Sequence, residues 1–505
     1  MHRHVLRVAA LTGAITAVAC VENAPVSPTG DSVIETAAVG SPSMQVTAGI
    51  VESAGRYLVV FKPGGTAAPA IAAELSTNGG RLEGLYEQLG FAVVSGINPA
   101  GATRLAKSNG VGSVEPDIEF TIEPATETAA LDAGEVGTES ATAPQTATQF
   151  ARQWNLRAIS ADAAWAGGAL GSADGSVAIL DTGIDYRWPD LSGRVDLTRS
   201  ISLRPDEDAR LQTWFGALNL NPITDLNAHG TLVSSIVASN SGFFAGVTTR
   251  TTLFGVKVCI VFNTCSTAAI LNGIVYAVNH GADVINMSLG GAFLKSASPG
   301  FVSVLNSVFN YANRNGTLIV VAAGNSAADI DHTDNIYFTY CNSPQVVCVS
   351  ATGPTAAPTS VGPFTNPDAV APYTNFGRSA ISLAAPGGGV TTANAFVSGP
   401  CSQTALAWHQ PPPPSPGAPL PPPVIDGPAC PSNLGLFRVS GAGTSFSSPH
   451  VAGVAAAVIA ATGRSNPSQL RAILQTSSDD LGQPGTDPFY GKGRLNAARA
   501  VGAIP

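Results

Sequence analysis

Four chemically useful residue types stand at the ends of predicted secondary-structure elements. Asp181 follows the apolar run "SVAIL", and His229 begins a predicted helix in "NAHGTLVSSIVAS". Asn325 follows the run "TLIVVAA", and the serine-rich segment 441–453, "GAGTSFSSPHVAG", begins another helix. An alcohol is a poor nucleophile until a base removes its proton, a carboxylate orients a histidine base, and an amide donates to an oxyanion. Together these residue types predict acyl transfer with a serine nucleophile.

Each part of this set also has an ordinary explanation. Asp-Thr-Gly occurs in aspartic proteases too, but those need a second such loop and this chain has one. His229 and the serines can cap helices, and Asn325 can be a turn residue. All four types stand at element ends in the order Asp, His, Asn, Ser, which favours the catalytic interpretation. The pattern alone does not choose among Ser445, Ser447 and Ser448.

The elements that must position these residues are typical of a parallel α/β sheet. Short, nearly continuous apolar runs indicate strands that are buried on both faces. They are "SVAIL", "LFGVKV", "DVINMSL", "TLIVVAA" and "AISLAA". Two segments with helical spacing lie between them and end at glycine. Sites in such sheets form beyond the carboxyl ends of the strands. We therefore expect residues 150–505 to form one domain that gathers the candidates at one sheet edge.

Composition limits the class of protein. The 505 residues predict two or three domains, and 45% hydrophobic residues allow a large core. Only 12% of residues are charged, the net charge is −9, and no basic patch occurs, so nucleic acid is not an expected partner.

The N-terminus predicts export. A short basic region, "MHRHVLR", precedes the apolar stretch "VAALTGAITAVA", which indicates a signal peptide over residues 1–20. No segment of the chain is expected to span a membrane, and the protein is expected to be secreted or in the cell envelope. "AVAC", ending at Cys20, resembles a bacterial lipobox with Ala17 in place of the usual leucine. Lipid attachment at Cys20 and ordinary signal cleavage stay open as alternatives.

Four further segments differ in composition. Residues 21–54 are rich in Ser, Thr, Pro and Gly and are expected to be disordered. Residues 55–120 have the strand and helix order of a small α+β, ferredoxin-like unit. Residues 121–149 hold five acidic residues and seven threonines but no basic residue, which predicts a solvated linker. Residues 411–423, "PPPPSPGAPLPPP", predict a stiff polyproline II surface loop.

Beyond Cys20 the chain has six cysteines, and export favours disulfides over reduced thiols. The short spacings favour pairing of neighbours. The expected pairs are Cys259–Cys265, Cys341–Cys348 and Cys401–Cys430.

The motifs around the candidate residues resemble those of the subtilisin family (subtilases), serine endopeptidases with the chain order Asp, His, Ser. The matching stretches extend over most of residues 153–501. They are "VAILDTGID", "HGTLV", "GVKV", "NGIVYAVNHGADVINMSLGG", "VVAAGN", "LAAPG" and "GTSFSSPHVAG". The resemblance implies a parallel-sheet, subtilisin-like catalytic domain flanked by helices. Residues 55–120 resemble the inhibitory propeptide of the same family.

The resemblance also implies the roles of the candidates. The family motif puts the nucleophile directly after Gly-Thr, which selects Ser445. Asp181 then orients His229, which acts as general base and then as general acid. Asn325 and the backbone N–H of Ser445 donate to the oxyanion. The other two serines of the segment become packing or capping residues.

Eight residues are implied to bind substrate. Those expected to pair with the peptide as an added strand are Ser288, Leu289 and Gly290. Those on the facing strand are Asn263 and Thr264, beside the expected Cys259–Cys265 bridge. Those forming one wall of the pocket for the residue before the scissile bond are Ala322, Ala323 and Gly324. These last three are small and leave room for a bulky apolar side chain, although close strand packing alone also explains them.

The chain departs from the family pattern in three places. Ala228 stands where the family usually has glycine, and Leu232 replaces a common histidine. The stretch between Asp181 and His229 is longer than in simple members, with 198–222 as added sequence that either extends the cleft or binds nothing.

The family needs no cofactor, but many members hold structural calcium. Asp190 in "WPDL" matches a ligand position in some of them. The loop that completes that site, here "SNSGFFAGV", is not clearly preserved, so an ordinary surface aspartate is the alternative to a calcium ligand.

The expected function is that of an exported, autoprocessed, monomeric serine endopeptidase of broad specificity with a preference for bulky apolar residues before the scissile bond. Its partners would be polypeptide substrates and its own propeptide, an intramolecular inhibitor. The alternatives are a dedicated processing protease and a catalytically silent binding protein, and the second is disfavoured because all four candidate residues are present.

Overall fold

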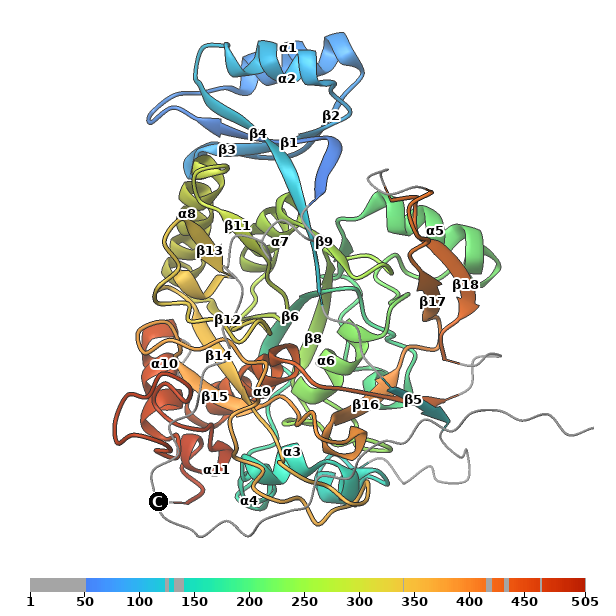
Figure 1. The fold of residues 1–505 in the computed structure, drawn as a ribbon, viewed down its shortest axis with the longest axis vertical. Helices are drawn as coiled ribbons and strands as arrows, with labels where there is room; N and C mark the ends of the chain where they lie inside the picture. The colour runs from blue at the N-terminus through green and yellow to red at the C-terminus, as the bar shows by residue number, and fades with distance from the viewer. Residues whose placement is uncertain are drawn as a thin grey trace, which may run out of the picture. The chain divides into compact units, whose positions relative to one another are not determined.

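A seven-stranded parallel sheet lies at the centre of this computed structural model (Figure 1). The strand order is β15-β14-β12-β10-β6-β8-β7, and every neighbouring pair is parallel. The strands are β6 (Ser176–Asp181), β7 (Ile201–Ser202), β8 (Thr252–Lys257), β10 (Val284–Met287), β12 (Leu318–Ala322), β14 (Val347–Thr352) and β15 (Leu383–Pro386). The α/β prediction and the five predicted strands are confirmed. The sequence pattern misses β7, which has two residues, and β14, whose apolar run is interrupted by Ser350.

The structure describes residues 51–122, 127–130, 140–338, 340–414, 420–430, 436–463 and 466–504. These all belong to the unit Gln45–Pro505. The predicted signal peptide, Cys20 and most of the predicted disordered stretch lie outside the described residues.

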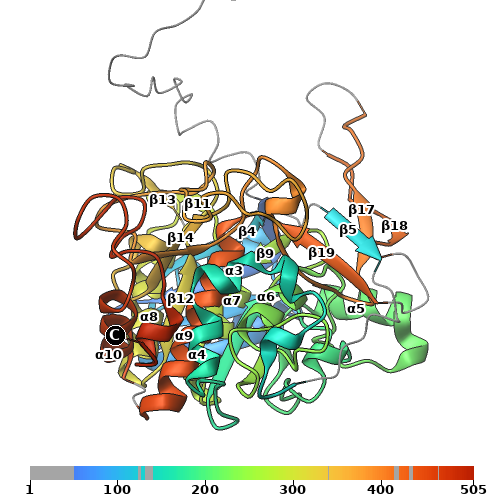
Figure 2. The same cartoon turned by 90° about the horizontal axis from the view of Figure 1, so that it is seen from below.

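Helices cover both faces of the sheet (Figure 2). Alternate residues of β6 point to opposite faces, as in any strand. Val177 and Ile179 contribute to one hydrophobic core, with α6 (His229–Val237) and α9 (Thr444–Thr462). Their neighbours Ala178 and Leu180 contribute to the other, with α7 (Thr267–Asn279) and α8 (Pro299–Arg314). The sheet is therefore buried on both sides, as its continuous apolar runs predict.

Smaller elements surround this centre. The remaining helices of the sheet domain are α3 (Trp154–Ala158), α4 (Ala161–Ala166), α5 (Pro205–Phe215), α10 (Pro467–Thr476) and α11 (Ala497–Ala500). The remaining strands are β9 (Thr264–Ser266), β11 (Ala292–Leu294), β13 (Ile336–Phe338), β16 (Val397–Cys401), β17 (Leu406–His409), β18 (Val424–Pro428) and β19 (Phe437–Gly441). Helix α5 lies in the added sequence between Asp181 and His229.

The N-terminal part is an antiparallel sheet with two helices. It consists of β1 (Val51–Phe61), α1 (Ala68–Asn78), β2 (Arg81–Tyr86), β3 (Phe91–Ser95), α2 (Pro99–Ala106) and β4 (Val111–Thr121). Its strand order, β2-β3-β1-β4, is that of a split βαβ unit. The first strand begins at Val51, so the predicted disordered stretch is four residues too long at its end. Beyond β4, the same sheet continues into β9 of the larger domain.

The predicted linker 121–149 is more ordered than its composition indicates. Residues Glu127–Ala130 form β5, which pairs antiparallel with β19. Gln149 donates its N–H to Phe243 O at 2.8 Å, and Ala147 lies buried in the core beside α4. Strand pairing and short turns use backbone hydrogen bonds, which do not require large apolar side chains. The solvated-linker expectation is therefore wrong for these two segments.

Three disulfides join neighbouring cysteines: Cys259–Cys265, Cys341–Cys348 and Cys401–Cys430. The last closes the base of the hairpin β17–β18, which carries the proline-rich insertion. The middle of that insertion, 415–419, lies outside the described residues.

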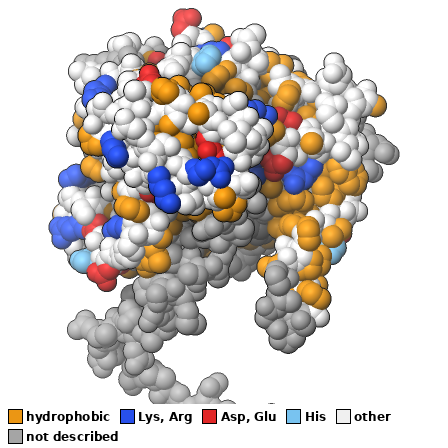
Figure 3. All heavy atoms as spheres, turned by 90° about the horizontal axis from the view of Figure 1, so that it is seen from above, with side chains coloured by type: hydrophobic (Ala, Val, Ile, Leu, Met, Phe, Trp, Pro, Cys, Tyr) orange, Lys and Arg blue, Asp and Glu red, His pale blue; other side chains and the backbone are white. Residues whose placement is uncertain are grey.

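One described helix, α9, is long and apolar enough to cross a membrane by length and composition. The sequence-based expectation that no segment has this property is thus wrong for α9. Its most apolar window is 83% buried inside the protein, where it serves as a core helix. On the face seen in Figure 3, basic and acidic side chains lie in small separate groups and form no single basic patch.

Candidate active site

The side chains of Asp181 and His229 are joined in the interior of the domain. Asp181 is the last residue of β6, and His229 is the first residue of α6. His229 Nδ1 lies 2.7 Å from Asp181 Oδ1, and both residues are fully buried. The other ring nitrogen, Nε2, has no hydrogen-bond partner among the described residues. With Nδ1–H donated to the carboxylate, Nε2 is left as a proton acceptor.

Asp225 fixes the turn that leads into α6. Its Oδ1 accepts from Thr182 Oγ1 at 2.9 Å and from the Ala228 N–H at 3.0 Å. Its Oδ2 accepts from the Thr231 N–H at 2.9 Å and from the Thr231 hydroxyl. One buried carboxylate therefore ties the residue after Asp181 to both sides of His229. Asp225 has no signal in the sequence pattern, although it lies only four residues before the histidine.

Ala228 carries backbone strain at the entry to α6. Its φ is 100°, in the region that favours glycine. The family pattern has glycine at this position, so the departure noted from sequence has a local conformational consequence.

Ser445 is the second residue of α9, and its neighbour Phe446 has its ring 5.7 Å from the His229 ring. The Ser445 hydroxyl donates to Ser288 O at 3.0 Å. In return the Ser288 hydroxyl donates to Ser445 O at 2.6 Å. That carbonyl is available because Pro449, four residues later, has no N–H to donate. The serine end of α9 is thus held against the residue that follows β10.

Pro449 lies in the second turn of α9, because the helix already begins at Thr444. Ser448 contacts Ser288, with 2.9 Å between the hydroxyl oxygens. The buried Ser447 hydroxyl has no partner among the described residues.

Asn325 lies beside the start of α9. Its Oδ1 accepts from the backbone N–H and the hydroxyl of Thr444, both at 2.9 Å. Because the amide oxygen is occupied by these donors, the amide nitrogen Nδ2 is the group left to donate to a bound molecule. The next residues are held by Asn375, whose Oδ1 accepts from Ser326 N and Ala328 N, both at 3.0 Å.

The pKa values of the two buried histidines near α9 shift in opposite directions. Burial acts to lower the pKa of His229, but the charge and hydrogen bond of Asp181, together with the charge of Asp225, outweigh it, and the pKa is raised above its ordinary value. Burial lowers the pKa of His450 to about 4, since no carboxylate offsets it. Its Nδ1 donates to Phe446 O, and its Nε2 accepts from Asn155 Nδ2 at 2.8 Å.

The end of β4 lies on the strand expected to bind substrate. Phe120 pairs with Cys265 and Thr121 with Thr264, antiparallel, and the Ile122 N–H donates to Asn263 O at 2.7 Å. On the other side, a Cβ added at Gly291 would lie 2.6 Å from Phe120 Cγ. A strand of the chain itself therefore occupies this edge of the domain.

The other expected substrate residues follow strand ends of the sheet. Ser288, Leu289 and Gly290 come directly after β10, and Leu289 is buried. Ala322 is the last residue of β12, and Ala323 and Gly324 follow it and lead to Asn325. Ala323 is packed between strands, with its carbonyl accepting from Asn375 Nδ2 at 2.8 Å. The Gly324 N–H donates to Thr444 Oγ1 at 2.9 Å, next to the candidate nucleophile.

Asp190 is neither a surface residue nor arranged as a calcium ligand. It is fully buried, and its carboxylate accepts from the N–H groups of Gly242, Phe243 and Phe244 at 2.7–3.0 Å. A carboxylate directed at three backbone donors does not fit a calcium ion, which needs oxygen ligands around it. No group of three or more His, Cys, Asp or Glu side chains suited to a metal occurs in the described part of the chain.

Sequence comparisons relate this chain to known proteins. A family model described as "Subtilase family" matches residues 172–493. Thermitase of Thermoactinomyces vulgaris is 28% identical over 356 residues, which cover 69% of this chain and 96% of thermitase. The major intracellular serine protease of Bacillus subtilis is 34% identical over 186 residues, which cover 36% of this chain and 52% of that protein.

Two solved structures have the same fold. The epidermin leader peptide processing serine protease of Staphylococcus aureus aligns with a TM-score of 0.61 and 19% identity, covering 89% of this chain and 98% of its own. Fervidolysin of Fervidobacterium pennivorans, a keratinolytic enzyme related to subtilisin, aligns with a TM-score of 0.60 and 19% identity, covering 90% of this chain and 61% of its own.

Proposed function

The chain belongs to the subtilase family of serine endopeptidases, and we propose that it cleaves polypeptides with Ser445 as nucleophile, His229 as base, and Asp181 as the group that orients the base. The observation that carries the proposal is the buried 2.7 Å contact between Asp181 and His229, which leaves Nε2 free to accept a proton.

The first chemical step begins with a rotation of Ser445. Its hydroxyl turns from Ser288 O towards His229 Nε2, which takes the proton as Oγ attacks the substrate carbonyl. Asp181 stabilises the imidazolium that forms. The buried surroundings strengthen this charge interaction compared with water.

The tetrahedral intermediate carries an oxyanion that needs donors. Asn325 Nδ2 and the N–H of Ser445 supply two, and the second belongs to the first turn of α9, where backbone N–H groups have no partner within the helix. His229 then protonates the leaving amine, and water hydrolyses the acyl-enzyme by the same steps in reverse order.

The N-terminal unit is proposed as an intramolecular inhibitor and folding assistant. Two of its carboxylates cap helices of the catalytic domain. Glu115 accepts from the N–H groups of Gly300 and Phe301 at α8, both at 2.9 Å. Asp117 accepts from the Ala268 N–H at 2.9 Å and from the Thr267 hydroxyl at 2.8 Å, at the start of α7. Negative charge is favourable at both helix N-termini.

Beyond these contacts β4 pairs antiparallel with β9, in the manner expected of a bound peptide. We expect maturation by self-cleavage between residues 123 and 139, after the docked strand; within this range Glu127–Ala130 form β5, which pairs with β19 of the larger domain. The three disulfides support export, and the small residues Ala322 to Gly324 support a bulky apolar preference before the scissile bond.

Peptide hydrolysis by the purified enzyme tests the proposal. Ser445→Ala is expected to reduce kcat by about 10⁶, the scale of nucleophile loss known for subtilisin. Ser447→Ala is the matched control, because its buried hydroxyl has no partner among the described residues. Equal activity of the wild type and Ser445→Ala would contradict the assignment. A broad cleavage pattern in a peptide library supports general proteolysis, whereas cleavage at one motif supports the alternative of a dedicated processing protease.

A further inference from the structure

The added sequence between Asp181 and His229 supplies a buried cation beside β9, the strand expected to bind substrate. Arg204 precedes α5 and is only 2% exposed. Its Nη1 donates to the carbonyls of Val258 and Thr264 at 3.5 and 3.2 Å, and its Nε and Nη2 donate to Asp206 at 3.1 and 3.2 Å. These contacts hold the guanidinium against β9, the strand on which β4 is docked.

The remaining partner of Arg204 comes from the docked strand. Arg204 Nη2 lies 2.9 Å from Glu119 Oε1, and Glu119 pairs with Ser266 in the β4–β9 register. Glu119 is the residue before Phe120, which packs against Gly291. An extended peptide in the same register would therefore place one side chain beside Arg204. The next side chain of that peptide would lie at the Phe120 position, against Gly291.

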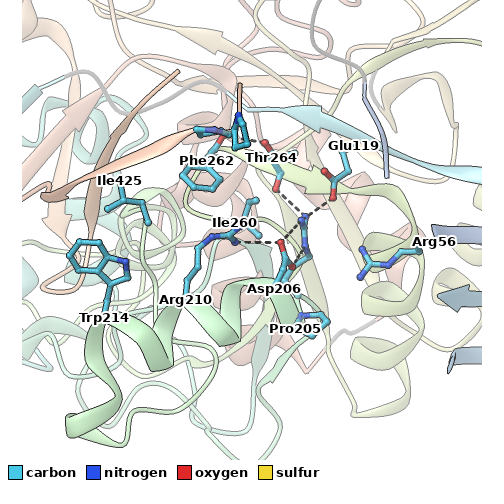
Figure 4. Close-up of a pocket in the computed structure, with 13 residues that line it drawn as sticks. Arg56, Glu119, Pro205, Asp206, Arg210, Trp214, Ile260, Phe262, Thr264 and Ile425 are labelled. Carbon is cyan, nitrogen blue, oxygen red and sulfur yellow. Dashed lines mark hydrogen bonds and ion pairs between the residues drawn. The ribbon is translucent and has the colours of Figure 1, made fainter. Parts of the chain in front are cut away.

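The contact between Arg204 and Glu119 borders an open cavity. Arg204 and Glu119 line a cavity of about 790 Å³ together with Arg210, Trp214, Phe262 and Ile425 (Figure 4). Side chains of several lengths fit at the Glu119 position, so charge rather than shape is the means of discrimination there. Once the N-terminal unit leaves, its Glu119 leaves too, and Arg204 keeps Asp206 as its carboxylate partner.

On this basis we infer that Arg204 gives the mature enzyme a preference for peptides with a carboxylate side chain at the Glu119 position, directly before a bulky apolar residue at the Phe120 position. The inference rests on the proposed function and names a specificity-determining residue for it. It also assigns a role to the sequence insertion, which extends the cleft by one charged subsite.

Internally quenched peptides with the processed enzyme test the inference. The peptides contain Glu-Phe-Thr-Ile, Gln-Phe-Thr-Ile or Lys-Phe-Thr-Ile, each followed by the same randomised residues. The expected order of kcat/KM is Glu, then Gln, then Lys, with a factor of about five between the first two at low salt, as for a partly exposed ion pair. The Glu-to-Gln ratio should approach one in 1 M salt, which screens the charges.

Arg204→Gln should bring the ratio of kcat/KM for the Glu peptide to kcat/KM for the Gln peptide to about one. Arg210→Gln is the matched control, since Arg210 lines the same cavity and contacts Asp206 but not Glu119, and its ratio should stay that of the wild type. Ratios within one variant do not depend on the fraction of folded enzyme. If Arg204→Gln does not fold, the order of kcat/KM among the three peptides and its salt dependence in the wild type still test the inference.

Equal rates for the Glu and Gln peptides in the wild type, or an unchanged ratio in Arg204→Gln, would overturn the inference while leaving the proteolytic function intact. Hydrolysis of none of the three peptides, nor of any peptide in a general library, would instead overturn the proposed function.

Discussion

Asp181 Oδ1, at the end of the central strand β6, lies 2.7 Å from His229 Nδ1, at the start of α6, and neither side chain is exposed. The contact fixes which nitrogen of the imidazole carries the proton and which one is left as a proton acceptor. The proposed chemistry depends on this pair more than on any other contact in the molecule.

The pair predicts the acid limb of the pH profile. Only neutral His229 can act as base, and its pKa is raised because the charge and hydrogen bond of Asp181, together with the charge of Asp225, outweigh the effect of burial. Activity is therefore lost as pH falls through a pKa above 6.5, and kcat/KM measured against pH should have its acid midpoint there. In Asp181→Asn the midpoint should move to lower pH and kcat should fall by about 10⁴. Asp174→Asn, an exposed change, is the control, and an unmoved midpoint in Asp181→Asn would contradict the assignment.

Asn325→Ala tests the oxyanion contact. We expect kcat to fall by about 10²–10³, or about 3–4 kcal/mol of transition-state stabilisation, with little change in KM. The figure is the one known for the corresponding asparagine of subtilisin itself and is carried over to this chain. Steady-state kinetics on one apolar peptide measures it. A raised KM with unchanged kcat would show that Asn325 binds substrate but does not stabilise the transition state.

Much of this site is predictable from sequence because the reactive residues lie at element ends with strong local signals. The run "SVAILDTG" specifies a buried strand ending at Asp181, and "GTSFSSPHVAG" specifies the start of α9. Asp225 and Arg204 are not predictable in this way. Asp225 contacts Thr182, which is 43 residues away, and Arg204 contacts Glu119, which is 85 residues away, and only the folded structure brings these residues together.

The N-terminal region shows a similar contrast. Its two helices and β1, β3 and β4 have clear patterns, whereas β2 is half-exposed and alternates weakly. The ordered parts of residues 121–149 are missed because their order depends on a partner strand and on core contacts, for which local composition gives no signal.

Ala228→Gly should stabilise the protein. A non-glycine residue at φ 100° costs about 1–3 kcal/mol, while glycine loses about 0.4–1 kcal/mol through greater freedom of the unfolded chain. We expect a net gain of about 1 kcal/mol in the free energy of unfolding, measured by urea denaturation in a Ser445→Ala background to prevent autolysis. A loss of stability would mean that the turn before His229 tolerates alanine without strain.

His450 predicts an acid-sensitive contribution to stability. Its pKa is about 4 in the folded chain and about 6.5 when unfolded, so the unfolded chain binds more protons between these values. The free energy of unfolding should therefore fall as pH falls from 6.5 to 4, by about 3 kcal/mol from this group. His450→Gln should lack that part of the pH dependence. Identical slopes for His450→Gln and its parent, both in the Ser445→Ala background, would show that burial does not hold His450 neutral.

The central claim, that Ser445 is the nucleophile of a self-processing endopeptidase, is tested most directly by the intact mass of the expressed chain. Wild type, Ser445→Ala and Ser447→Ala should be expressed side by side and followed by mass spectrometry. The account predicts that the wild type and Ser447→Ala are cut between residues 123 and 139, while Ser445→Ala keeps its N-terminal unit uncut. The same cut in Ser445→Ala, made without any other protease present, would contradict it.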